Sequence, residues 1–206
     1  MKKSIWLCLL MIIIICIIIF FFFNKNSSKV LKNGNNMSSQ EIVDYILNIS
    51  SYKANVTVQI NSNKNSNKYI LNQEYISPNT SKQEVIEPSN IAGVRIIRDE
   101  NGLTLENTRL SLSAIYENYE YISENCLDLS SFISDYSSSN KSSCEEKDNQ
   151  VIMKTENTDG KNNIKNKILY VDKESIKPKR LEIKDNNQKT TVNILYNEVE
   201  IIEQNH

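Results

Sequence analysis

The fold class is set by residues 37–60, MSSQEIVDYILNISSYKANVTVQI. Ser38 followed three residues later by Glu41 is a capping box, in which each side chain accepts a hydrogen bond from the backbone N–H of the other residue. Apolar residues then recur at the spacing of one helix face, at Ile42, Tyr45, Ile46 and Ile49. These signals predict an amphipathic helix that needs an apolar surface to cover.

That surface is predicted directly downstream, because Tyr52–Ile60 alternates apolar and polar residues with the period of a half-buried strand. A second, short helix is expected over Leu127–Tyr136, capped by Asp128. The other predicted strands are Lys68–Ser77, Lys82–Glu87, Val94–Arg98, Leu103–Asn107, Gln150–Thr155, Lys165–Asp172, Arg180–Lys184 and Thr190–Glu200. This order predicts an α+β domain, with a large curved antiparallel sheet packed on helices.

Charge and composition exclude several classes of function. The 206 residues carry 24 Lys and Arg against 25 Asp and Glu, a formal net charge of −1, which argues against a basic nucleic-acid binder. The only histidine is His206, so no base is available for a Ser-His-Asp or Cys-His site, nor the imidazoles that most zinc hydrolases use. We therefore predict no catalytic residues, no metal site and no cofactor.

The N-terminus predicts a membrane anchor. Residues 5–23 carry no charge, and as a helix they would reach roughly 28 Å, enough to span a bilayer. No small residues mark a cleavage site, so we expect an uncleaved anchor over residues 1–23, a polar tether over 24–37 and the domain over 38–206, exported from the cytoplasm. Cys16 is a weak candidate for lipid attachment, because isoleucines precede it where lipidation signals place a small residue.

Two cysteines and three tyrosines are the candidate site residues of the exported part. A disulfide between Cys126 and Cys144 would stabilise the fold by about 3 kcal/mol in the chain-entropy model, and two free structural thiols are the alternative. Tyr116, Tyr119 and Tyr121 form either a partner-facing aromatic patch or ordinary packing residues.

The carboxylates Glu145, Glu146 and Asp148 are expected to lie in a solvated loop. The functional alternative is the acid/base pair of a glycosidase, which requires no histidine.

The closing segments carry a resemblance to a known family. Residues 168–185, ILYVDKESIKPKRLEIKD, followed by Thr190–Ile201, resemble the last strands of the LolA-like family, in which a curved antiparallel half-barrel is plugged by helices. Within that family, YENYEYI at 116–122 ahead of LDLSSFI at 127–133 is similar to clostridial spore germination lipoproteins of the GerS type. The resemblance covers roughly residues 38–202, but it lacks the family's lipidated cysteine, because neither Cys8 nor Cys16 follows a small residue.

This resemblance implies a non-catalytic accessory protein of sporulation and germination. It would bind and support a cortex N-acetylmuramoyl-L-alanine amidase of the CwlD type, so that muramic-δ-lactam is made in the cortex peptidoglycan and spores can germinate. The implied location is the spore envelope, in the forespore intermembrane space. The alternative is an extracytoplasmic carrier of a lipid or lipoprotein acyl chain; an extracytoplasmic sensor ranks last. Exposed strand edges also allow a homodimer, including one formed by strand exchange.

Overall fold

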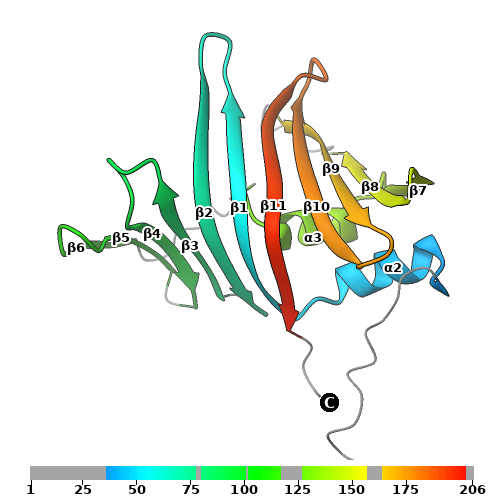
Figure 1. Cartoon of the computed structure of the whole chain (residues 1–206), viewed down its shortest axis with the longest axis horizontal. Coiled ribbons are helices and arrows are strands. Elements are labelled where there is room, and N and C mark those ends of the chain that lie inside the picture. The colour runs from blue at the N-terminus through cyan, green and yellow to red at the C-terminus, as the bar shows by residue number, and fades with distance from the viewer. Residues whose placement is uncertain (1–35, 78–79, 101, 117–126, 157–163, 203–206) are drawn as a thin grey trace, which may run out of the picture. The chain divides into compact units, whose positions relative to one another are not determined.

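The computed structural model of the chain describes residues 36–77, 80–100, 102–116, 127–156 and 164–202 (Figure 1). The chain divides into two compact units, Met1–Lys32 and Asn33–His206, and the described ranges all belong to the second. Within these ranges, no helix has the length and apolar character needed to cross a bilayer. The predicted anchor over residues 1–23, with Cys16, lies outside them.

The described residues form one antiparallel sheet of eleven strands and two helices. The sheet order is β6-β5-β4-β3-β2-β1-β11-β10-β9-β8-β7, so strands that are adjacent in the sheet are consecutive in sequence except where β1 meets β11. The strands are β1 (Ser51–Asn61), β2 (Ser66–Ile76), β3 (Thr80–Glu87), β4 (Val94–Asp99), β5 (Gly102–Asn107), β6 (Leu112–Tyr116), β7 (Ser143–Lys147), β8 (Gln150–Glu156), β9 (Ile164–Asp172), β10 (Lys177–Asp185) and β11 (Thr190–Ile202). The helices are α2 (Ser39–Leu47) and α3 (Leu129–Ser138).

The pairing of β1 with β11 joins the two halves of the sheet. It runs from Ser51 opposite Ile202 to Ile60 opposite Val192. A bulge interrupts it after Asn55, where the extra residue Asn197 donates from Nδ2 to Asn55 Oδ1 at 2.9 Å. Asn55 Nδ2 in turn donates to Asn72 Oδ1 of β2 at 2.8 Å. A ladder of side-chain amides therefore crosses the three central strands on one face.

The opposite face, which we call the core face, carries the hydrophobic core. The predicted alternation of β1 is confirmed, since Val56 and Val58 are fully buried in one cluster with Ile42 and Ile46 of α2 and Phe132 of α3. All members of the core cluster belong to the unit Asn33–His206. This unit therefore holds its own core and is expected to fold without residues 1–32.

The predicted capping box at the start of α2 is confirmed. The Ser38 side chain accepts from the Glu41 backbone N–H, and the Ser38 backbone N–H donates to Glu41 Oε2 at 2.7 Å. These hydrogen bonds favour the ionised carboxylate and hold the pKa of Glu41 below its ordinary value. The helix therefore begins where the sequence predicts.

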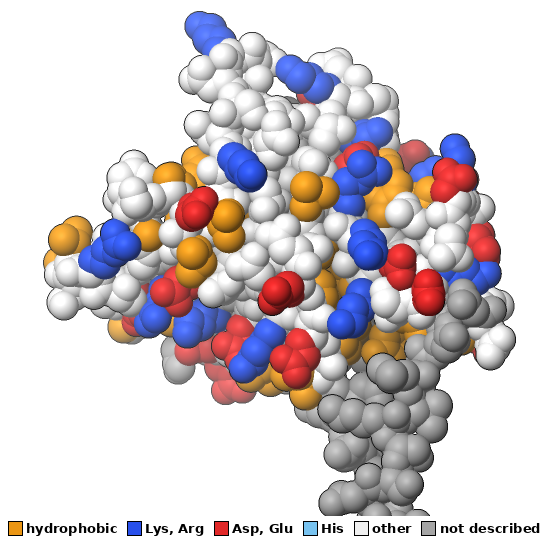
Figure 2. All heavy atoms as spheres, in the orientation of Figure 1, with side chains coloured by type: hydrophobic (Ala, Val, Ile, Leu, Met, Phe, Trp, Pro, Cys, Tyr) orange, Lys and Arg blue, Asp and Glu red, His pale blue; other side chains and the backbone are white. Residues whose placement is uncertain are grey.

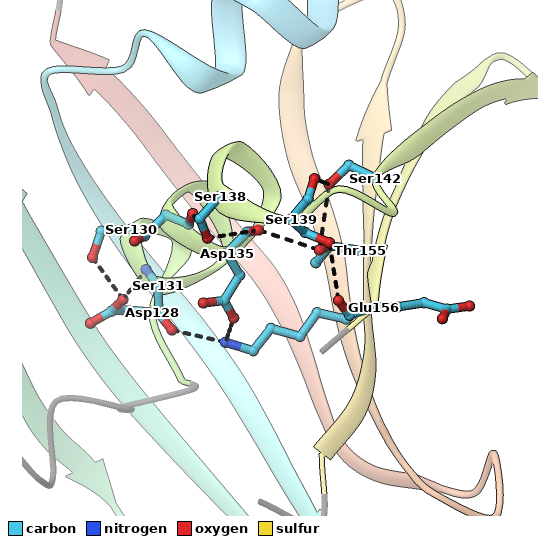
Figure 3. A network of polar contacts seen from close by, with 11 residues as sticks. Asp128, Ser130, Ser131, Asp135, Ser138, Ser139, Ser142, Thr155 and Glu156 are labelled. Atoms are coloured by element: carbon cyan, nitrogen blue, oxygen red, sulfur yellow. Dashed lines mark hydrogen bonds and ion pairs between the residues drawn. The ribbon is translucent and has the colours of Figure 1, made fainter. Parts of the chain in front are cut away.

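Polar contacts, drawn in Figure 3, hold α3 to the sheet, and its Leu129 and Phe132 are buried in the core. Asp128 caps the helix, accepting from the Ser131 backbone N–H at 2.7 Å. Lys167 of β9 is 5% exposed, and its Nζ lies 2.5 Å from Asp135 Oδ2 and 2.9 Å from Ser131 Oγ. The buried ammonium is therefore neutralised by the helix that covers it.

The N-terminus of α3 also contacts the central strands through Tyr52 of β1. The backbone N–H of Leu129 donates to the Tyr52 hydroxyl at 3.1 Å. Burial, reinforced by the nearby Asp128 carboxylate, holds the pKa values of Tyr52 and Tyr196 well above the ordinary value. Both phenols are therefore neutral at physiological pH.

Two strands differ from the sequence prediction. The sequence predicts no strand over Leu112–Tyr116, and these residues extend the sheet as β6. Glu145 and Glu146, expected in a loop, lie on β7, and only Asp148 is in the turn that follows. The solvent exposure expected for all three carboxylates is confirmed.

The contact between α3 and Lys167 predicts unequal effects of removing its two partners. Asp135→Ala leaves a buried ammonium with Ser131 Oγ, and we expect the free energy of unfolding to fall by about 2–3 kcal/mol. Lys167→Met removes the buried charge and leaves a half-exposed carboxylate that water can solvate, so we expect a loss of about 1 kcal/mol or less. Urea denaturation of both variants at neutral pH measures the difference, and equal losses would contradict this description of the contact.

Candidate functional site

The candidate site is the end of the sheet formed by β5 and β6. Within the described residues, β6 is the last strand on this side of the sheet, and all five of its residues are exposed. The large apolar side chains here are exposed by 40% at Leu105, 65% at Leu110, 62% at Leu112, 66% at Ile115 and 45% at Tyr116. We call these five residues the edge surface.

The edge surface presents apolar side chains on both faces of the sheet. Leu105 is paired with Ala114 of β6 and with Ile96 of β4, which places Leu105 on the core face. Leu112 and Tyr116 share that face because strand side chains alternate, and Ile115 points to the other face. Figure 2, seen from the side opposite α3, shows hydrophobic side chains over β5 and β6 at the left end. β6 therefore exposes apolar side chains on both faces of the sheet.

The face opposite the core face, which we call the outer face, carries ion pairs away from the edge surface. Lys53 of β1 lies 3.2 Å from Glu74 of β2, and Arg95 of β4 lies 2.9 Å from Glu84 of β3. Figure 2 shows charged side chains of both signs across the middle of this face. Ion pairs of this kind are typical of a solvated sheet face, so the edge surface is the distinctive part.

The turn that leads into β6 is fastened to the β3–β4 connection. Asn107 Oδ1 accepts from the backbone N–H groups of Arg109 and Leu110, each at 3.1 Å. Thr108 N–H donates to the Gly93 carbonyl at 3.0 Å, and a Cβ on Gly93, whose φ is +87°, would meet Thr108 Oγ1 at 2.7 Å. Gly93 therefore permits a close approach that positions the edge surface.

A small pocket lies on the core face beside this surface. It has a volume of about 150 Å³, and its apolar lining includes Val58, Leu71, Ile96 and Leu127. Typical small-molecule sites measure roughly 300–1,000 Å³. The apolar side chains of α2, β1 and β2 on the core face are each at most 5% exposed: Ile42, Ile46, Val56, Val58 and Leu71.

The carboxylates of β7 are arranged as ion-pair partners. A hydrogen bond from Lys154, at 2.6 Å, holds the pKa of Glu145 below its ordinary value, and one from Lys173 does the same for Glu146. Consecutive strand residues also point to opposite faces. A glycosidase acid instead needs a raised pKa and a second carboxylate across the same cleft. Within the described ranges, no cluster of three His, Cys, Asp or Glu could hold a metal ion.

The structure describes some of the predicted site residues, and the others lie outside the described ranges. Tyr116 ends β6 in the edge surface, whereas Tyr119 and Tyr121 lie outside the described residues. Cys144 is half-buried on β7 and packs against the core, and Cys126 also lies outside the described residues. The disulfide between Cys126 and Cys144 therefore stays a prediction. The exposed Leu105, Leu110, Leu112 and Ile115 were not predicted as site residues.

Comparison with solved structures shows a shared fold. A chain in the structure of the CwlD amidase from Clostridioides difficile in complex with the GerS lipoprotein aligns at 20% identity, covering 79% of this chain and 93% of that chain, with a TM-score of 0.53. A conserved protein from Thermus thermophilus aligns at 12% identity, covering 82% and 90%, with a TM-score of 0.51. At these identities the likeness concerns the fold alone.

A LolA superfamily protein from Nitrosomonas europaea aligns at 11% identity over 82% of this chain and 96% of that one, with a TM-score of 0.42, too low to carry an argument. The large antiparallel sheet with helices on one face is confirmed, and the more specific LolA-like half-barrel stays a prediction.

Comparison of the sequence shows the family. No curated protein sequence matches the chain significantly. A family model described as sporulation protein YdcC-like matches residues 2–204, nearly the whole chain. The finer GerS type predicted from residues 116–133 stays a prediction, and the chain belongs to the YdcC-like family of sporulation proteins.

Proposed function

We propose that this protein is a non-catalytic accessory protein that binds a CwlD-type cortex amidase through the edge surface and supports its activity during sporulation. Its family is one of sporulation proteins, and its fold is shared with a chain from a complex between such an amidase and a lipoprotein. The resulting muramic-δ-lactam would mark the cortex for degradation during germination.

The exposed edge surface is the observation that carries this proposal. Soluble proteins usually protect an edge strand with charges, proline or a covering element, because its backbone groups can pair with another chain. Residues 112–116, LSAIY, contain no charge and no proline. Contiguous exposed apolar side chains of this kind mark protein–protein contact sites. A partner strand could add to β6 while its side chains cover Leu112 and Ile115.

The anchor, the tether and the disulfide belong to the same proposal. Residues 1–23 would hold the protein in a membrane, and 24–37 would let the unit Asn33–His206 reach an amidase in the forespore intermembrane space. A bridge from Cys126 to Cys144 would connect the segment before α3 to β7. A homodimer through a strand edge would compete with the amidase for the edge surface.

The second candidate, a lipid or acyl-chain carrier, is favoured by one observation, the apolar lining of the pocket on the core face. Its volume of about 150 Å³ is small for this role, since ligand pockets usually exceed roughly 300 Å³. The accessory role is therefore the better supported of the two.

Amidase binding tests the proposal directly. The unit Asn33–His206 should retain the cortex amidase of the same organism in a pull-down and raise its activity on peptidoglycan, because binding stabilises the competent state of the partner. The unit alone should release no product. No retention together with no change in activity would overturn the accessory role, and extraction of a lipid by the unit would favour the carrier.

Charge substitutions in the edge surface should weaken amidase binding. Leu112→Lys and Ile115→Lys place an ammonium where an apolar contact is expected, and each should raise the Kd at least about tenfold. Because both positions are exposed, the free energy of unfolding should change by no more than about 0.5 kcal/mol.

The matched control is Leu195→Lys, at a residue of β11 that is 42% exposed and lies away from the edge surface. This variant should bind the amidase like the wild type when measured by isothermal titration calorimetry. An equal loss of affinity in all three variants would show that the edge surface is not the docking site.

A further inference from the structure

Two turns of the central strands project together at one end of the sheet (Figure 1). They connect β1 to β2 and β10 to β11, and we call residues 61–68 and 184–190 the tip surface. Lys189 Nζ donates to Asn63 Oδ1 at 3.3 Å, so the two turns contact each other. The strands lead from the tip surface over roughly 30 Å to the opposite end of the sheet, where β1 begins and β11 ends.

The tip surface has an excess of positive charge. Its charged residues are Lys64, Lys68, Lys184, Lys189 and Asp185. The Asp185 carboxylate is engaged in its own turn, because Oδ1 accepts from the backbone N–H groups of Asn187 and Lys189, each at 2.9 Å. Of the four lysines, only Lys184 forms an ion pair with a described residue, at 3.8 Å from Glu182. Figure 2 shows Lys and Arg side chains at this end, at the top of the view. Three ammonium groups are therefore available to a ligand.

Hydrogen bonds from side chains hold the backbone of the tip surface in shape. In the first turn, Ser62 Oγ accepts from the Asn65 backbone N–H at 3.0 Å. Ser66 Oγ donates to Asn61 Oδ1 at 2.8 Å, which closes the base of the same turn. Asp185 has the corresponding role in the second turn. Because the turns are already ordered, a ligand that binds the lysines has little backbone to fix.

The rest of the tip surface is polar. Residues 61–68 and 184–190 include no apolar side chain. Four of the asparagines are exposed and make no side-chain hydrogen bond with a described residue: Asn65, Asn67, Asn186 and Asn187. Proteins that lie on a membrane usually bury apolar side chains in it as well as pairing with its charges. The composition of the tip surface therefore favours a hydrated anionic polymer over a membrane.

We propose that the tip surface binds peptidoglycan. The ammonium groups of Lys64, Lys68 and Lys189 pair with the carboxylates of its stem peptides. Side-chain amides both donate and accept hydrogen bonds, so the exposed asparagines match the hydroxyl and acetamido groups of the sugars. An exposed ion pair contributes little by itself, and a repeating polymer engages several at once. The choice of peptidoglycan among anionic polymers rests on the proposed function, because it is the substrate of the amidase.

The tip surface and the edge surface are far enough apart to be occupied together. β6 follows β2 across the sheet after β3, β4 and β5. Neighbouring strands lie about 4.8 Å apart, so β2 and β6 are separated by roughly 20 Å. A polymer on the tip surface therefore leaves the edge surface open, and an amidase docked there would be held close to its substrate.

Cosedimentation with purified peptidoglycan sacculi tests the tip surface without any amidase. The unit Asn33–His206 should sediment with sacculi, and its apparent affinity should fall at least about fivefold from about 50 mM to about 500 mM NaCl, because salt screens exposed charges. Sacculi treated with hydrofluoric acid, which removes attached phosphate polymers, should bind equally well. Absence of sedimentation, or its loss after the acid treatment, would overturn the proposal. Binding to phosphatidylglycerol vesicles in place of sacculi would assign the tip surface to a membrane.

The double variant Lys64→Gln with Lys189→Gln locates the binding. Both lysines are exposed, so the variant should unfold at the same urea concentration as the wild type, and its apparent Kd for sacculi should rise at least about fivefold. The matched control is Lys147→Gln with Lys177→Gln, which removes the same charge from exposed positions on β7 and at the opposite end of β10. The control should bind like the wild type. Equal losses in the two double variants would show that net charge alone governs binding and would overturn the proposal.

Failure of this inference can be distinguished from failure of the proposed function. Amidase binding by a unit that does not sediment with sacculi would overturn the peptidoglycan site alone. Sedimentation with sacculi by a unit that does not bind the amidase would overturn the accessory role and leave the peptidoglycan site standing. If both bind, Lys64→Gln with Lys189→Gln should leave the Kd for the amidase unchanged, and a weakened amidase complex would show that the tip surface contacts the enzyme instead.

Discussion

The pairing of the first strand with the last is the constraint on which the rest of the structure depends. β1 and β11 are separated by nearly the whole domain, yet they meet at the centre of the sheet. Val56 lies opposite Tyr196 and Val58 opposite Ile194, and all four side chains are buried in the core. Without this pairing β1–β6 and β7–β11 would be two separate meanders. The core forms only when the last strand is in place.

The helices cover the two halves of this sheet unequally. α2 contacts β7 and β8, and α3 contacts β8 and holds the buried Lys167 of β9. Figure 1 shows α3 behind β11 and β10, while β3–β6 extend away from both helices. The described helices therefore pack on the C-terminal half of the sheet, and the N-terminal half has a small pocket and an exposed edge. The functional features follow from this asymmetry, because both lie where no described helix packs.

Much of the fold could be predicted from local patterns. Ser38 and Glu41 identified the start of α2, Asp128 identified the cap of α3, and sequence patterns, among them the alternation of β1, predicted nine of the eleven strands. The missed strands lack that signal: β7, SCEEK, is mostly polar, and β6, LSAIY, is exposed on both faces. Alternation arises when one face is buried, so a strand without a buried face is not visible in the pattern.

The candidate site was harder to predict for the same reason. Tyr116 was identified by residue type, but the exposed leucines beside it resemble core residues in a sequence. That Leu105, Leu112 and Tyr116 share one face depends on the register of β4, β5 and β6, which is set by tertiary packing.

Hydrogen exchange in the presence of the amidase tests the central claim, that the partner docks on the exposed end of the sheet. With bound amidase, the backbone amides of β5 and β6 should exchange more slowly, because added strand pairing and burial protect them, and those of β7–β9 should be unchanged. Protection confined to β7, α2 or α3 would contradict the account, and so would binding without protection of β6.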